Sequence, residues 1–274
     1  MNRRRLLTVA RTDLRQLWQS PDFWVPMVIL AGFFFVVAPA VLLSLITTAG
    51  RSPAVQRVAT AIDVLPARAQ QAVQGATPAA RTSYALAVYL FAPLAVIVPM
   101  TISTAVGAAT LVGEKERGTG EFLAHSPASD REIYLGKLVA SLLPGYVTTL
   151  VGFGVYSLIV NLIVGPKVGG WFFPTGEWWV LMVWVVPPFL ALTLSVVLRL
   201  SARVRSSAAA QQASGLVTLP LIMVSYAQSS GLLLGGPTSG LVVGLVAWGA
   251  AGTGLWRGAH AVTRARLLGI DGRM

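Results

Sequence analysis

One uninterrupted apolar run, at residues 23–46, constrains what this chain can fold into more than any other feature. Its 24 residues carry no charge, and it is longer than the roughly 20 apolar residues that cross a bilayer as a helix. The composition agrees, because 11% of the residues are charged and the mean hydropathy is +0.70, whereas soluble proteins contain about 25% charged residues. The sequence therefore argues against a soluble enzyme, a secreted scaffold and a free nucleic-acid-binding protein.

Five further apolar runs reach or approach spanning length, and the second and third spans are long enough to tilt or to project into the cytosol. We therefore predict an all-α polytopic membrane protein with six transmembrane helices in a single domain, residues 1–274. Its parts are an amphipathic interfacial helix at 1–21, a membrane bundle at 22–257 and a cytoplasmic tail at 258–274. The predicted spans are residues 23–46, 84–112, 133–164, 178–198, 208–228 and 238–256.

The chain is strongly basic, with 21 Lys and Arg against 10 Asp and Glu. In a soluble protein this excess would suggest a nucleic-acid partner, but in a membrane protein the cations gather on the cytoplasmic side. With the N-terminus inside, 16 of the 21 cations lie on the cytoplasmic side and 5 on the other. The charge distribution therefore predicts cytoplasmic termini in a plasma or inner membrane, and no nucleic-acid partner.

The segments on either side of the first span show helical periodicity. Near the N-terminus, an apolar stripe lies beside Arg4, Arg11 and Arg15, which predicts an amphipathic helix at the inner interface rather than a signal peptide. A basic helix surrounded by water is the alternative. The outer segment 48–83 predicts one or two short helices, without an assigned role. The N-terminal stripe consists of Leu7, Ala10, Leu14, Leu17 and Trp18.

Charged residues are missing from the middle of the predicted spans, and all ten acidic residues lie outside these spans. Proton- and cation-driven pumps usually carry ionisable residues inside the membrane. If this protein moves a solute uphill, we expect the energy to enter from outside the membrane. The predicted spans hold neutral polar residues instead, including Thr101, Ser103, Thr104, Thr148, Thr149, Asn161, Thr193, Ser195, Thr218 and Ser225.

Enzymatic chemistry finds little support in the sequence. The histidines, His125 and His260, both lie in cytoplasmic segments, whereas an intramembrane serine protease needs a serine and a histidine in hydrogen-bond reach. Ser239 and His260 stand at opposite ends of the last span, about 30 Å apart along a helix. The chain has no cysteine, which removes disulfides and thiolate metal sites, and we predict neither a catalytic residue nor a metal site.

The cytoplasmic loop between the second and third spans has the densest acidic character, with five of the ten acids between Glu114 and Glu132. Glu114 and Arg117 form an i, i+3 pair that extends the second span into the cytosol. Gly118 can end that helix, and Thr119 can cap a short new one. Glu121 then lies favourably near the positive end of the short helix.

Two apolar residues, Phe122 and Leu123, follow on this short helix before Pro127 stops it. An exposed apolar pair framed by charges is typical of a docking contact, although a solvated connector would have the same pattern. Ser129 and Glu132 form a capping box that leads into the third span.

The runs 113–119 (Gly-Glu-Lys-Glu-Arg-Gly-Thr), 121–123 (Glu-Phe-Leu) and 126–137, which ends in Gly-Lys, resemble the signature of a known family. This family comprises the permease subunits of the second ABC exporter class (ABC-2-type), and it includes NatB-like sodium exporters, drug exporters and polysaccharide exporters. The family pattern runs close to E-K-E-R-G-T-L-E-x-L-L-x-[TS]-P. Gly120 replaces the common leucine and should loosen the short helix, since glycine costs about 1 kcal/mol there.

The resemblance implies that this loop is a coupling helix seated in a groove of a separate ATPase subunit. Phe122 and Leu123 would make the apolar contact. It also implies a second permease copy or paralogue, a substrate pathway between the two bundles, and export. The residues that the resemblance assigns to ATPase coupling, within the loop 113–137, are Glu114, Lys115, Glu116, Arg117, Gly118, Thr119, Glu121, Phe122 and Leu123.

ATP hydrolysis is not expected on this chain. A phosphate-binding loop needs G-x-x-x-x-G-K-[ST], and the nearest approach, Gly136-Lys137-Leu138, lacks the first glycine and the final hydroxyl. We therefore predict no cofactor here, with ATP and Mg²⁺ on the partner ATPase. The alternatives are a non-transporting membrane scaffold or sensor, and a secondary transporter or channel. The neutral spans favour hydrophobic or amphipathic cargo, with sodium still open.

Overall fold

The structure is a computed structural model that describes residues 2–49, 53–63, 65, 67–116, 125–201, 212, 215 and 237–261. Regular structure in these ranges is helical, without strands. Five helical stretches are long and apolar enough to cross a membrane, which confirms a polytopic all-α protein. Of the predicted span 208–228, residues 212 and 215 alone are described, so the structure does not test this span. The five stretches are Pro21–Thr48, Pro78–Thr110, Asp130–Ile163, Gly176–Ser201 and Thr238–His260.

Three of the five described spans change helical register along their length, and two do not. The third and last spans are single α-helices, α9 (Asp130–Ile163) and α14 (Pro237–Ala261). The other three contain π-helical segments. In order they are α2 (Pro21–Gly32), η1 (Phe33–Val37) and α3 (Ala38–Ala49); α6 (Pro78–Ala85), η2 (Leu86–Leu90) and α7 (Leu94–Glu116); and α11 (Gly176–Trp179), η3 (Val180–Val185) and α12 (Val186–Ser201).

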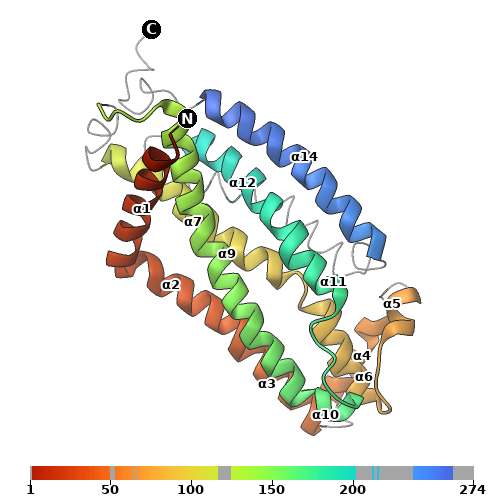
Figure 1. Cartoon of the computed structure of the whole chain (residues 1–274). Coiled ribbons are helices and arrows are strands. Elements are labelled where there is room, and N and C mark those ends of the chain that lie inside the picture. Colours follow the sequence, from red (N-terminus) through yellow and green to blue (C-terminus); the bar gives the residue numbers. More distant parts are fainter. Residues whose placement is uncertain are drawn as a thin grey trace.

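Short helices lie at both ends of this bundle. Figure 1 shows α1 (Arg3–Gln19) and the N-terminus at one end, and α4 (Pro53–Asp63), α5 (Ala67–Ala72) and α10 (Gly165–Val168) at the other. The helix predicted near the N-terminus and the short helices predicted in the outer segment 48–83 are therefore present.

The second and fourth spans form the centre of the bundle, since 67% of an 18-residue apolar segment of each is buried, against 22–28% of such a segment in the other three. Helix α7 packs on α9 and α12, and α12 packs on α14. The outer helices expose large apolar side chains, such as Ile29 at 65%, Leu162 at 69% and Val246 at 66%. Such faces suit hydrocarbon rather than water, as expected for a protein that lies in a bilayer.

Each π-helical segment ends two or three residues before a proline: η1 before Pro39, η2 before Pro93 and η3 before Pro187. Proline has no N–H to donate, and its ring clashes with the carbonyl of the preceding turn. A local π register accommodates the proline and leaves carbonyl groups without their usual backbone partner.

Aromatic side chains supply the missing donors. In η2 the N–H of Phe91 bonds Leu86 O, and the N–H of Ala92 bonds Tyr89 O. The intervening carbonyls accept from side chains instead: Tyr156 Oη donates to Ala87 O at 2.6 Å, and Trp178 Nε1 donates to Val88 O at 2.9 Å.

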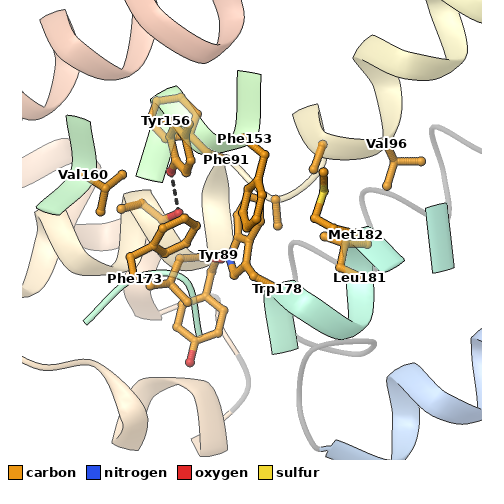
Figure 2. Packing of buried hydrophobic residues seen from close by; sticks show 14 of the residues in the cluster. Tyr89, Phe91, Val96, Phe153, Tyr156, Val160, Phe173, Trp178, Leu181 and Met182 are labelled. Atoms are coloured by element: carbon orange, nitrogen blue, oxygen red, sulfur yellow. Dashed lines mark hydrogen bonds between the residues drawn. The ribbon is translucent and has the colours of Figure 1, made fainter. Parts of the chain in front are cut away.

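The same device occurs in η3, where Tyr146 Oη donates to Met182 O at 3.1 Å. Two of the donors, Tyr146 and Tyr156, come from α9. Around the break in the second span, Trp178 stacks on Phe153 and Tyr156, and Phe173 meets Tyr156 and Trp178 edge-on. Figure 2 shows this aromatic cluster from close by. This cluster fixes the outer half of the core.

The connection between the third and fourth spans is held by Asn161. Its Oδ1 accepts from the backbone N–H groups of Phe172 and Phe173 at 3.0 and 3.1 Å, and its Nδ2 donates to Phe173 O. A buried amide thereby satisfies the backbone of an outer loop, as buried polar groups require. Asn161 therefore has a structural role.

Candidate functional site

The structure describes the two stems of the cytoplasmic loop that the sequence singles out. Helix α7 continues to Glu116, so Glu114, Lys115 and Glu116 form its last turn. This confirms the predicted extension of the helix beyond the membrane span. The chain is described again from His125, and α9 begins at Asp130. The other residues assigned to coupling lie outside the described residues: Arg117, Gly118, Thr119, Glu121, Phe122 and Leu123.

The predicted capping box at the start of α9 is present. Ser129 is the N-cap residue, and its Oγ accepts from the N–H of Glu132 at 3.3 Å. In return, Glu132 Oε2 accepts from the N–H of Ser129 at 2.9 Å. The second stem therefore starts at a fixed residue rather than fraying toward the loop.

Helix α1 holds this same turn, which the sequence did not predict. The backbone N–H of Asn2 donates to Glu132 Oε1, and Arg5 Nη1 donates to Pro127 O at 2.7 Å. Residues more than 120 positions apart in the sequence are thus joined beside the loop.

The two helices then approach closely at Gly136 of α9. A Cβ atom on Gly136 would lie 2.9 Å from Val9 Cβ and 3.1 Å from Leu6 O. Only a glycine leaves room for the backbone of α1 at this point. The glycine of the Gly-Lys pair that ends the signature run is therefore a position where α1 and α9 pack closely.

The lysine of that pair is also buried. Lys137 is 1% exposed, and its Nζ lies 3.3 Å from Asp13 Oδ2 of α1. The same ammonium donates to Thr110 O of α7 at 3.1 Å. Burial raises the pKa of the Asp13 carboxyl, and the charge of Lys137 offsets part of that rise. The sequence gave Lys137 a place in the family signature and among the cytoplasmic cations, but it predicted neither its burial nor a role for Asp13.

Asp13 also changes how the face of α1 is interpreted. The predicted apolar stripe is divided, because Ala10 is buried on the side of Asp13, whereas Leu7 and Trp18 are 60% and 80% exposed. The buried side packs on α9, and the exposed side, next to Arg11, is free to meet the membrane interface. The signal that could have found this packing is the polar Asp13, one helical turn from Ala10 and Leu17.

His260 and Arg131 join α14 to the same region. Arg131 Nη2 lies 2.8 Å from His260 Nε2, and His260 Nδ1 lies 2.7 Å from Trp256 O. Since a guanidinium only donates and a carbonyl only accepts, this geometry has His260 accepting at Nε2 and donating at Nδ1. Ser239 and His260 lie near opposite ends of α14, as the sequence predicted, so they do not form a serine-histidine pair.

The neutral polar residues of the spans mostly bond their own helix. Among those the structure describes, the hydroxyls of Thr104, Thr149 and Thr193 donate to backbone carbonyls of the preceding turn. They do not converge on one polar site. The described residues also contain no group of three His, Asp or Glu side chains that could hold a metal ion. Two of the predicted polar residues, Thr218 and Ser225, lie outside the described residues.

A comparison with protein families gives one match, to the family described as ABC-2 family transporter protein, over residues 7–237. This match covers most of the chain. The chain belongs to the ABC-2 family of transporter proteins. It is therefore a multi-pass permease subunit of an ABC transporter in the plasma membrane, as the resemblance of the loop implies. No curated protein matches it.

The matched residues of this ABC-2 permease include α1 from Leu7 onward, both stems of the loop and four of the five described spans. The match is to the family as a whole and does not assign the NatB-like branch. Helix α14 begins where the matched region ends, at Pro237. The contacts of Asp13, Gly136 and Lys137 thus lie within the part of the chain that the family shares.

Proposed function

We propose that this permease is the membrane subunit of an ATP-driven exporter, and that it docks on a separate ATPase through residues 114–123. One observation carries this proposal. Along the chain, the docking segment is flanked by two ordered stems, the extended end of α7 and the capped start of α9, and α1 contacts the second stem. A partner that binds between these stems can pass force to both of their spans.

ATP and Mg²⁺ belong to the partner in this proposal. The nearest approach to a phosphate-binding loop contains Gly136 and Lys137, and both are used for packing. Gly136 is covered by α1, and Lys137 is buried against Asp13. A phosphate-binding loop presents its backbone N–H groups and its lysine to the nucleotide, so this pair cannot serve as one.

The transport pathway is proposed to lie between two permease copies, or between this chain and a paralogue, with export as the direction. The hydroxyls of Thr104, Thr149 and Thr193 bond their own helices, and the outer faces of α2, α9 and α14 are apolar. Such surfaces favour hydrophobic or amphipathic cargo, because a charged solute would meet no counter-charge there.

Co-purification with the ATPase tests the docking. The permease is expressed with a candidate ATPase, and the retained ATPase is measured for the wild type and for a Phe122→Asp Leu123→Asp variant. We expect the variant to lose the ATPase, because two carboxylates replace the apolar contact. Leu7→Asp, at an exposed apolar position of α1, is the matched control and should retain it. Full retention of the ATPase by the double variant would refute docking through this segment.

A further inference from the structure

Lys137 lies where three helices meet at the cytoplasmic end of the bundle. It belongs to α9, its ammonium is 3.3 Å from Asp13 Oδ2 of α1, and it donates to Thr110 O of α7 at 3.1 Å. Thr110 lies less than two turns before the described end of α7 at Glu116. One buried cation therefore joins α1 to both stems of the docking segment.

Burying an ion pair between helices costs free energy. Each charge loses several kcal/mol of hydration on burial, and well-packed apolar residues of similar volume are often as stabilising or more so. Lys137 and the Asp13 side chain are 1% and 9% exposed. Stability alone therefore does not account for the pair, whereas a requirement for one defined arrangement of helices does.

Further contacts join α1 to the start of α9. Glu132 and Pro127 accept hydrogen bonds from Asn2 and Arg5 at the start of α1. Gly136 packs against the middle of α1, and Lys137 pairs with Asp13 one turn later. At its other end, α1 is separated from α2 by Ser20 alone. The carbonyl of Ser20 accepts from Phe23, and its N–H donates to Leu17 O, so the connection is itself hydrogen-bonded.

We propose that the Asp13–Lys137 pair is a positioning junction, which links α1 to both stems of the docking segment and passes movement of that segment to α1 and the first span. The junction rests on the docking function proposed above. It gives the first span a direct connection to the ATPase-facing loop, although the loop lies between the second and third spans. Lys137 performs this role through its three-way contact and touches no substrate.

The test follows α1 in the assembled complex. Because the chain has no cysteine, spin labels are introduced through Thr8→Cys on α1 and Gln71→Cys on outer helix α5, both exposed positions. Distances between the labels are measured in nanodiscs with the ATPase bound, before and after addition of ATP and Mg²⁺. We expect ATP to shift the distance in the wild type.

Two variants separate the junction from simple packing. The variant Asp13→Leu Lys137→Met keeps a similar side-chain volume, so it should fold and retain the ATPase. It should lose the ATP-dependent change in distance, because neither new side chain can donate a hydrogen bond to Thr110 O. The exchange Asp13→Lys Lys137→Asp keeps a pair of opposite charge and should recover at least part of the shift. A full shift in the apolar variant, or no shift in a folded exchange variant that binds the ATPase, would overturn the junction.

The outcome for docking is read separately. If the wild type does not retain the ATPase, then the docking function fails and the junction fails with it. If every variant retains the ATPase and ATP shifts α1 equally in all of them, docking stands and the junction alone is refuted.

Discussion

At the scale of single residues, prolines and the side chains that answer them explain the irregular parts of this permease. Pro93 and Pro187 each withdraw a backbone donor, and the carbonyls left behind are met by Tyr156, Trp178 and Tyr146. In a bilayer no water replaces such a donor, so these side chains are needed to satisfy the backbone carbonyls. The prolines are visible in the sequence, but the side chains that donate to the freed carbonyls lie 36 to 90 positions away, on other helices.

Tyr156→Phe should therefore destabilise the protein. It leaves Ala87 O without its donor, which costs about 1–3 kcal/mol for a buried group. Tyr134→Phe is the matched control, since Tyr134 lies on the same helix, is equally buried, and its hydroxyl finds no partner among the described residues. Thermal unfolding of the detergent-solubilised chain measures both, and equal losses would contradict the role of the Tyr156 hydroxyl.

The charge on Lys137 should make stability depend on pH through Asp13. Lys137→Met removes the cation that offsets the effect of burial, so the pKa of Asp13 rises further. A raised pKa in the folded state gives stability that is complete below the unfolded value of about 3.9 and is lost as pH rises through the folded value. The free energy of unfolding of the variant should therefore fall further below that of the wild type as pH rises above the unfolded value of about 3.9.

Thermal unfolding at several pH values measures this difference in stability between Lys137→Met and the wild type. The double variant Asp13→Asn Lys137→Met has no carboxyl at this site and serves as the control, because its stability should lack the trend. A gap between Lys137→Met and the wild type that does not change with pH would show that Asp13 is not the group responsible.

At the scale of helices, sequence periodicity and caps predicted most of what the structure describes. The apolar runs predicted five described spans, and Ser129 with Glu132 predicted the start of α9. Periodicity reports which face of a helix is apolar, but it does not report which neighbour covers that face. The contact of α1 with α9 was missed for this reason, since it depends on Gly136 and on a charge pair 124 residues apart.

Gly136→Ala should push α1 away from α9. The new Cβ meets Val9 and the backbone of Leu6, and overpacking of this kind costs about 1–3 kcal/mol. Gly154→Ala, on the same helix, meets nothing within 4 Å and should instead stabilise by up to about 1 kcal/mol through helix propensity.

The separation of α1 can be followed directly. A cysteine introduced at Ala10, which is 3% exposed, should react slowly with a maleimide in the wild-type background. It should react faster when Gly136→Ala is added and at an unchanged rate when Gly154→Ala is added. An unchanged rate with Gly136→Ala would mean that α1 does not depend on this contact.

At the scale of the whole molecule, charge and apolar surface together orient the protein. The outer helices expose apolar faces, and the sequence assigns 16 of the 21 cations to one side of the membrane. The end that carries α1 and the stems of the docking segment must then face the compartment that holds the ATPase. The outer helices α4 and α5 face the other way.

Cysteine labelling in intact cells tests this orientation. Gln71→Cys on α5 should react with a membrane-impermeant maleimide added outside, whereas Thr8→Cys on α1 should react only after the membrane is permeabilised. The reason is the positive-inside rule, since 16 of the 21 cations lie on the side assigned to the cytoplasm. Labelling of Thr8→Cys in intact cells would invert the topology and would place the docking segment where no ATP is available, so this experiment also tests the premise of the ATPase partnership.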